Sequence, residues 1–143
     1  KFLFFKQGPV LALNNPSEQI KRGQYLVEGP GHCGECHTPR NLLGGPKYDQ
    51  WLAGAANPEG EGVIQNITTG EGGIADWSES QLASMLKDGF TPEFDSVGGS
   101  MTAVVANWSH VSDEDRAAVA AYLKAVPAHA NGYPVLTKPA ANQ

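Results

Sequence analysis

The sequence predicts an all-α fold in which short helices are joined by long loops. Two segments, residues 78–89 and 112–127, carry apolar residues at helical spacing behind a capping serine. No stretch has the pattern of a convincing strand, and there is no internal repeat. The 17 glycines and 10 prolines form about 19% of the 143 residues, against roughly 12% in average proteins. A chain of this length is expected to form one domain with a modest core.

The first helix is predicted over residues 16–28. Asn15 is expected to cap it, with Pro16 at the first helical position and Glu18 three residues after the cap. Gly23 lies in the middle of this helix, where glycine costs about 1 kcal/mol relative to alanine. The close approach of another helix would explain that cost.

A second helix is predicted to begin at Ser78, where Gln81 completes a capping box, and to end at Gly89. Met85 shares an apolar face with Leu82 and Leu86, so we expect it to belong to the core. A shorter helix is expected over residues 102–108.

The last helix is predicted over residues 113–126. Ser112 is expected to cap it with Asp115 completing the box, and Pro127 stops it. Its apolar residues recur at i, i+3, i+4 and i+7 and include Tyr122. We expect this helix to cross the first one where Gly23 meets Tyr122.

The chain divides into a connector (1–15), a main domain (16–127) and a tail (128–143), which is expected to be a strap or a loose end. Residues 41–76 are expected to be mostly loop. The chain begins with Lys1 rather than Met, which predicts that it was processed or excised from a larger protein.

Composition excludes two classes of partner. The net charge is −5, and no basic run is present, so nucleic acid is not expected to bind. No stretch approaches the roughly 20 apolar residues of a membrane span. Association with a membrane would therefore need parts outside this chain.

The two cysteines lie in the stretch GHCGECHTPR, with Cys33 and Cys36 directly followed by His37. A structural zinc site needs four ligands, usually from two such pairs, and no second pair exists. A redox dithiol usually accompanies a βαβ pattern, which this chain lacks. A disulfide between these cysteines would close a very small loop and add little stability.

The pattern Cys-x-x-Cys-His is typical of covalent c-type haem attachment. The two thiols add to the two vinyl groups of the porphyrin, and the two-residue gap sets the separation of the sulfurs. His37 is then the predicted proximal ligand of the iron. A backbone carbonyl in the following loop is expected to accept its second ring proton, but the sequence leaves open which one. The haem would also supply core to this loop-rich chain.

The predicted sixth ligand of the iron is Met101. It follows two glycines in a loop 64 residues after His37, which is enough chain to wrap the haem edge and reach the opposite face. Its thioether is a soft ligand that favours ferrous iron and raises the reduction potential.

The remaining histidines are given other roles. His32 is tied to the same side of the haem as Cys33 and is expected to be a surface group or a propionate neighbour. His110 is the alternative distal ligand, and His129 is expected to be solvated. Arg40 is a candidate partner for a haem propionate, because a buried carboxylate needs a charged or hydrogen-bonding partner.

The chain resembles class I cytochromes c. It is most similar to the haem domains of the multihaem cytochrome subunits of membrane-bound bacterial alcohol, gluconate and aldehyde dehydrogenases. The resemblance rests on four stretches: RGQYLVEGPGHCGECHTPRN (22–41), QNIT (65–68), IADWSESQLASMLKDG (74–89) and VGGSMTAVVANWSHVSDEDRAAVAAYLKAVP (97–127). The opening KFLFFKQGP also resembles the connector that leads into such a domain.

The resemblance implies a class I cytochrome c-like fold, with short helices and long loops wrapped around one covalently bound haem c. It further implies haem-edge positions for a set of loop residues, for which loop packing is the alternative: Asn66, Ile67, Thr68 and Trp77. Two features depart from the family: a glycine-rich stretch at 70–73, and the single haem motif, which makes this chain less than a whole multihaem subunit.

The predicted function is therefore one-electron transfer without catalysis. The donor would be a dehydrogenase subunit or another redox protein, and the acceptor a further cytochrome or an oxidase. The resemblance implies a location in the periplasm or on the outer face of the cytoplasmic membrane. The alternative is a haem enzyme or a gas-binding haem protein with an open or labile sixth position, which requires that Met101 does not bind iron.

Overall fold

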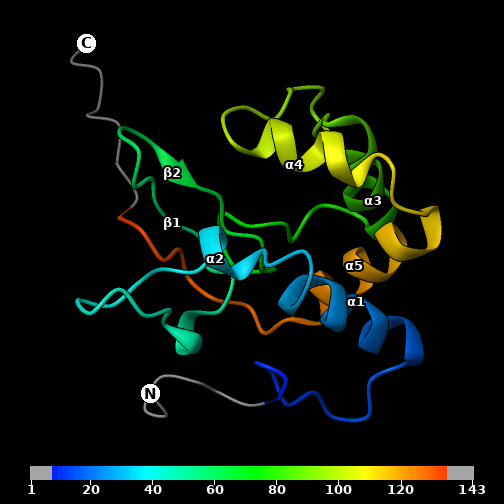
Figure 1. Cartoon of the computed structure of the whole chain (residues 1–143), viewed down its shortest axis with the longest axis horizontal. Helices are drawn as coiled ribbons and strands as arrows, with labels where there is room; N and C mark the ends of the chain where they lie inside the picture. The colour runs from blue at the N-terminus through cyan, green and yellow to red at the C-terminus, as the bar shows by residue number, and fades with distance from the viewer. Residues whose placement is uncertain (1–7, 135–143) are drawn as a thin grey trace.

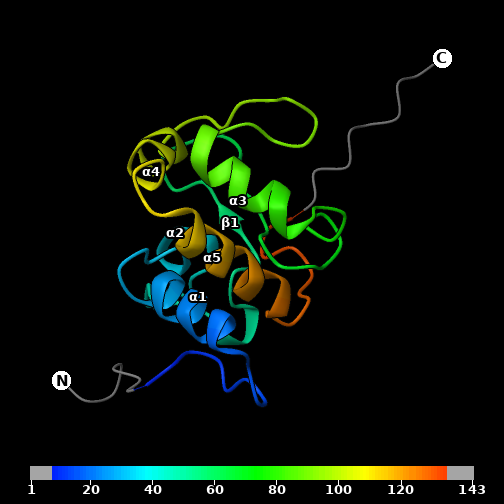
Figure 2. The same cartoon turned by 90° about the vertical axis from the view of Figure 1, so that its right-hand side faces the viewer.

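The computed structural model describes residues 8–134, which form a small helical domain with long loops (Figure 1). The elements follow in chain order: α1 (Glu18–Glu28), α2 (Gly34–His37), the 3-10 helix η1 (Tyr48–Gln50), β1 (Ala55–Ala56), β2 (Val63–Ile64), α3 (Glu79–Asp88), α4 (Met101–Trp108) and α5 (Asp113–Ala125). Helix α1 packs along α5, and α3 packs on the other side of α5 (Figure 2). The predicted all-α class is thus confirmed, with one very small exception.

The first helix begins later than predicted. Its N-cap is Ser17, whose hydroxyl accepts a hydrogen bond from the Ile20 amide at 3.2 Å. The predicted cap at Asn15 is wrong, because this residue has a φ of 47° and belongs to the turn before the helix. Ser17 has the extended backbone that an N-cap requires.

Helices α1 and α5 meet at Gly23, as predicted. A Cβ atom on Gly23 would collide with the Ala118 carbonyl and lie 2.8 Å from the Cβ of Tyr122. Beside this crossing, the Arg22 guanidinium donates two hydrogen bonds to Asp115, at 2.8 and 2.9 Å. The glycine therefore allows the helix backbones to approach closely, and the ion pair bridges the two helices at its edge.

A chain of hydrogen bonds runs through this crossing. The Tyr122 hydroxyl donates to Glu28 Oε1 at 2.7 Å and accepts from the indole nitrogen of Trp51 at 3.2 Å. Burial, and secondly the neighbouring Glu28, raise the pKa of Tyr122 well above its ordinary value. Glu28 also accepts from the Val10 amide at 2.7 Å, so residues 8–15 are tied to the helix pair.

Helix α3 has the predicted capping box, formed by Ser78 and Gln81. It ends at Gly89, which has a φ of 80° and donates its amide to the Met85 carbonyl. Met85 is partly buried against the core, as predicted, and Leu82 and Leu86 are buried beside it.

Helices α4 and α5 each differ from prediction by one residue at one end: α4 begins at Met101, and α5 ends at Ala125. The Ser112 hydroxyl accepts from the Asp115 amide at 3.1 Å, as expected of a cap. The carboxylate of Asp115 does not complete the box, because it pairs with Arg22 instead.

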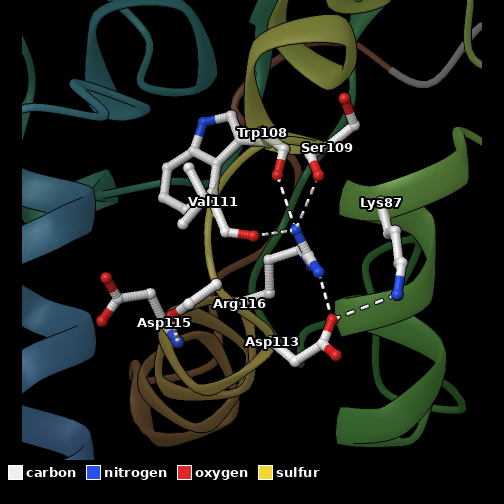
Figure 3. A network of polar contacts seen from close by, with 8 residues as sticks. Lys87, Trp108, Ser109, Val111, Asp113, Asp115 and Arg116 are labelled. Carbon is white, nitrogen blue, oxygen red and sulfur yellow. Dashed lines mark hydrogen bonds and ion pairs between the residues drawn. The ribbon is translucent and has the colours of Figure 1, made fainter.

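A buried arginine joins α4 to α5 (Figure 3). Arg116 is 3% exposed, and its guanidinium donates to three backbone carbonyls at the end of α4: Trp108, Ser109 and Val111. It also pairs with Asp113, which Lys87 of α3 contacts at 3.2 Å. Both terminal nitrogens of the guanidinium thus have hydrogen-bond acceptors, and the charge lies near a helix C-terminus, where a cation is favoured.

The prediction of no strands is wrong at one point. Strands β1 and β2 pair antiparallel, with Ala55 opposite Ile64 and Ala56 opposite Val63. Strands of two residues are too short to show the alternation that identifies a strand in sequence. The rest of residues 41–76 is mostly loop, as predicted, apart from the single turn η1.

Residues 128–134, which we call the C-terminal strap, lie across the loops on the side of α2 and β1 (Figure 1). The His129 amide donates to Thr68 Oγ1 at 3.1 Å, and the Gly132 amide donates to the Ala53 carbonyl at 2.8 Å. The described part of the tail is therefore a strap rather than a loose end. The outer parts of the predicted connector and tail, 1–7 and 135–143, lie outside the described residues. None of the helices within residues 8–134 is both long and apolar enough to cross a membrane.

Candidate haem-attachment site

The cysteine motif forms the short helix α2. Cys33 is its N-cap and partly buried, whereas Cys36 is exposed. Residues three apart on a helix share a face, so the two thiols lie on one side of α2. Gly34 is buried, and a side chain there would collide with the indole of Trp51. The absence of a side chain at Gly34 thus allows α2 to pack directly against the Trp51 ring.

The environment of Cys33 is apolar. It packs against the core, and its amide donates to the Val27 carbonyl at 3.2 Å. Burial raises the pKa of the Cys33 thiol to about 11. Redox-active dithiols have a lowered thiol pKa, so this environment argues against a redox dithiol.

His37 is held at both its backbone and its ring. Its carbonyl accepts from the Gly54 amide at 2.7 Å. Its ring nitrogen Nδ1 lies 2.7 Å from the Gln65 carbonyl, 28 residues later. A carbonyl only accepts, so Nδ1 carries the proton and Nε2 is left as the nitrogen that can bind a metal. Burial lowers the pKa of His37, which favours the neutral imidazole that ligation needs.

The side chain of Gln65 closes the loop that follows it, because its amide donates to the Gly72 carbonyl at 2.6 Å. Asn66 and Thr68 are fully buried and bond to each other, because Thr68 Oγ1 donates to Asn66 Oδ1 at 2.8 Å. The amide of Asn66 also donates to the strap, at the His129 carbonyl. These two side chains therefore support the loop from within. Their contact with a haem stays a prediction.

Ile67 and Trp77, the other two predicted haem-edge residues, are partly buried against the core. The loop that carries Trp77 is held by a lysine that sequence reasoning missed. Lys124 Nζ, from α5, donates to three carbonyls of this loop: Ile74, Ala75 and Trp77. The Lys124 ammonium group thus holds the backbone of residues 74–77, just before α3, in place.

Arg40 does not stand free. It donates to Glu35 Oε2 at 2.6 Å and to the Gly44 carbonyl at 2.7 Å. Glu35, between the two cysteines, was not singled out from the sequence, since a lone acidic residue carries no specific pattern. The pair orients Arg40 beside the motif helix, and its role toward a propionate stays a prediction.

Met101 is the first residue of α4 and is partly buried against the core. Gly99, two residues before it, has a φ of 55°, a conformation that favours glycine. His32 and His110 are exposed, whereas His129 is half-buried and not simply solvated as expected. The role of Met101 as an iron ligand stays a prediction.

The donor set fits an iron porphyrin. It offers two thiols on one helix face, an imidazole whose Nε2 is free for a metal, and a thioether in the Met101 segment. Within residues 8–134, no three His, Cys, Asp or Glu side chains are grouped so that they could hold a metal ion. A tetrahedral zinc site would need four such ligands.

Comparisons with known proteins agree with this chemistry. A family model described as Cytochrome c matches residues 20–127. The chain is 58% identical over 113 residues to a "Diheme cytochrome c-type" protein of Cereibacter sphaeroides, covering 79% of this chain and 36% of that protein. It is 36% identical over 130 residues to the "Alcohol dehydrogenase (quinone), cytochrome c subunit" of Gluconobacter oxydans, covering 80% and 25%.

A third relative is the "Fructose dehydrogenase cytochrome subunit" of Gluconobacter japonicus. It is 41% identical over 115 residues, with 80% of this chain and 23% of that protein covered. The chain thus spans about a third or less of the length of the relatives it matches.

Proposed function

This chain belongs to the cytochrome c family of electron-transfer proteins, and we propose that it carries one electron at a time on a single haem c. In this proposal Cys33 and Cys36 hold the haem covalently, and His37 and Met101 ligate its iron. The haem supplies reversible one-electron chemistry between ferrous and ferric iron. The chain supplies attachment, ligand orientation and a shielding core.

The observation that carries the proposal is the hydrogen bond from His37 Nδ1 to the Gln65 carbonyl. Metal-bound histidines usually donate their second ring proton in this way, which sets the tautomer and the ring orientation. Here the attachment thiols and the free Nε2 belong to one motif, and the acceptor that orients the ring comes from Gln65, 28 residues after His37. The haem domain proper would span residues 16–127, with 8–15 and the C-terminal strap packed on it.

Other residues are assigned supporting roles around the haem. Arg40, oriented by Glu35, would face a propionate. Ile67 and Trp77 would contact the porphyrin edge, and Asn66 and Thr68 would border it from the loop they brace. These groups exclude water and orient the cofactor. None is assigned a catalytic step, so the domain itself is proposed not to be an enzyme.

The partners would be redox proteins: a dehydrogenase subunit as donor, and another cytochrome or an oxidase as acceptor. The printed names of the relatives, which include cytochrome subunits of alcohol and fructose dehydrogenases, support this assignment. The proposed location is the periplasm or the outer face of the cytoplasmic membrane. Family membership favours the electron carrier over a haem enzyme or gas-binding protein.

The test is production of the chain with a c-type haem maturation system, followed by mass spectrometry under denaturing conditions. We expect the polypeptide mass plus one haem for the wild type, and no covalent haem after both Cys33→Ser and Cys36→Ser. A redox titration should then follow a single one-electron curve. A bare polypeptide mass, or robust peroxidase turnover by the intact protein, would contradict the proposal.

A further inference from the structure

The C-terminal strap touches the two segments that hold His37. On the backbone side, the Gly132 amide donates to the Ala53 carbonyl, and the next residue, Gly54, donates its amide to the His37 carbonyl. On the ring side, His37 donates to the Gln65 carbonyl. The residue after Gln65 is the one that reaches the strap.

That residue, Asn66, donates its amide to Asn131 Oδ1 and to the His129 carbonyl, each at 3.0 Å. Asn131 also covers Gly72, where an added Cβ would lie 2.7 Å from its side-chain nitrogen. The Gly72 carbonyl is the acceptor for the Gln65 side chain. A single strap residue therefore contacts both ends of the loop whose first carbonyl receives the His37 proton.

The strap fits this position closely. A Cβ on Gly70 would collide with the His129 carbonyl. A Cβ on Gly132 would collide with the Gly54 carbonyl and lie 2.6 Å from Pro39, two residues after His37. Because Gly70 lies in the loop and Gly132 in the strap, the two backbones are in direct contact. A shift of the strap would therefore displace the loop.

We propose that Asn131 is a positioning residue for the proximal ligand: through Asn66 and Gly72 it holds the Gln65 carbonyl where His37 donates its proton. The inference rests on the proposed function, in which His37 ligates the iron. Asn131 lies beyond residue 127, where the match to the family model ends.

The consequence is electronic as well as structural. A hydrogen bond donated by the ligand imidazole increases its basicity, and a more basic ligand stabilises ferric iron. Loosening the Gln65 carbonyl should therefore raise the reduction potential and expose the His37 ring proton to exchange.

The experiment compares Asn131→Leu, Asn131→Ala and Asn131→Asp in the haem-loaded chain. We measure the midpoint potential and, by NMR, the exchange rate of the His37 Nδ1 proton. The leucine and alanine variants lose the side-chain acceptor at position 131, which is one of the two acceptors of the Asn66 amide, so both should show an upward shift in potential and faster proton exchange. The aspartate variant keeps the acceptor, and its added charge can only lower the potential, so it should retain slow exchange without an upward shift.

The matched control is Asn57→Leu, because among residues 8–134 the side chain of Asn57 bonds only within its own loop, to Glu59 and Glu61. It should leave the potential and the exchange rate unchanged. Loaded, cooperatively folded Asn131→Ala protein with wild-type potential and exchange would overturn the inference alone. Equal shifts in Asn57→Leu would also overturn it. A wild-type chain that takes up no covalent haem would overturn the proposed function, and this inference with it.

Discussion

The indole of Trp51 fills the space in which a side chain on Gly34 would lie, so the motif helix α2 rests directly on this ring. The same indole donates to the Tyr122 hydroxyl, which in turn donates to Glu28. The cysteine motif is thereby connected to the crossing of α1 and α5. Changes at this contact should affect the stability of both.

Gly34→Ala should overpack this contact and lower the free energy of unfolding by about 1–3 kcal/mol. Trp51→Phe, which has a smaller ring and no indole N–H, should cost about 1 kcal/mol for the lost hydrogen bond, plus some packing. The two changes should couple, because the smaller ring gives the new methyl group room. Denaturant unfolding of the haem-loaded single and double variants measures the coupling. If the changes in unfolding free energy simply add in the double variant, the two positions are not in packing contact.

Gly23→Leu should separate α1 from α5, since a Cβ there already collides with the Ala118 carbonyl. We expect a loss of roughly 3 kcal/mol or more, at the upper end of overpacking costs. The matched control is Gly98→Ala, because a Cβ at Gly98 meets no atom of the described residues within 4 Å. Thermal melting of both variants tests the crossing. A wild-type melting temperature for Gly23→Leu would contradict it.

Met101→Ala should abolish the long-wavelength sulfur-to-ferric-iron absorption, lower the reduction potential and open the iron to CO. Met85→Leu conserves volume on the core-facing side of α3 and should cost less than about 1.5 kcal/mol while leaving the spectrum unchanged. Optical spectra of both redox states, with and without CO, separate the two methionines. The reverse pattern would assign the ligand to Met85, and CO binding to the wild-type ferrous protein would favour the gas-binding alternative.

The ion pair between Arg22 and Asp115 should make stability depend on acid pH. The hydrogen bond from Arg22 holds the pKa of Asp115 below its ordinary value of 3.8 in the folded state. The stabilisation is therefore present above about pH 4 and is lost as the pH falls through the lower, folded-state pKa.

Asp115→Asn should reduce the slope of melting temperature against pH in this acid range. Glu114→Gln removes a charge from the same exposed helix turn and serves as the control. A slope that falls equally in both variants would assign the effect to net charge rather than to this pair.

Features that depend on residues close together in the chain could be predicted from the sequence. The cap of α3 at Ser78, its end at Gly89 and the apolar stripe of α5 follow from local hydrogen bonding and helical periodicity, which act over three to four residues. The Cys-x-x-Cys-His motif is equally local. The helix crossing at Gly23 could be inferred because a glycine in mid-helix lowers helix stability, and the close approach of another backbone explains why it is present. The cap of α1 was misplaced, because Asn15 and Ser17 are both capping residues and only the backbone conformation decides between them.

The groups that surround His37 depend on how the whole chain folds, and no local pattern in the sequence marks them. The acceptor for His37 is the backbone carbonyl of Gln65, and every residue carries such a carbonyl, so no side-chain pattern marks it. The strap contact at Asn131 joins residues 65 positions apart in the chain. Such contacts arise because the folded loops must satisfy buried polar groups with whatever backbone or amide lies nearest. That proximity is a property of the assembled chain and not of any short segment of it.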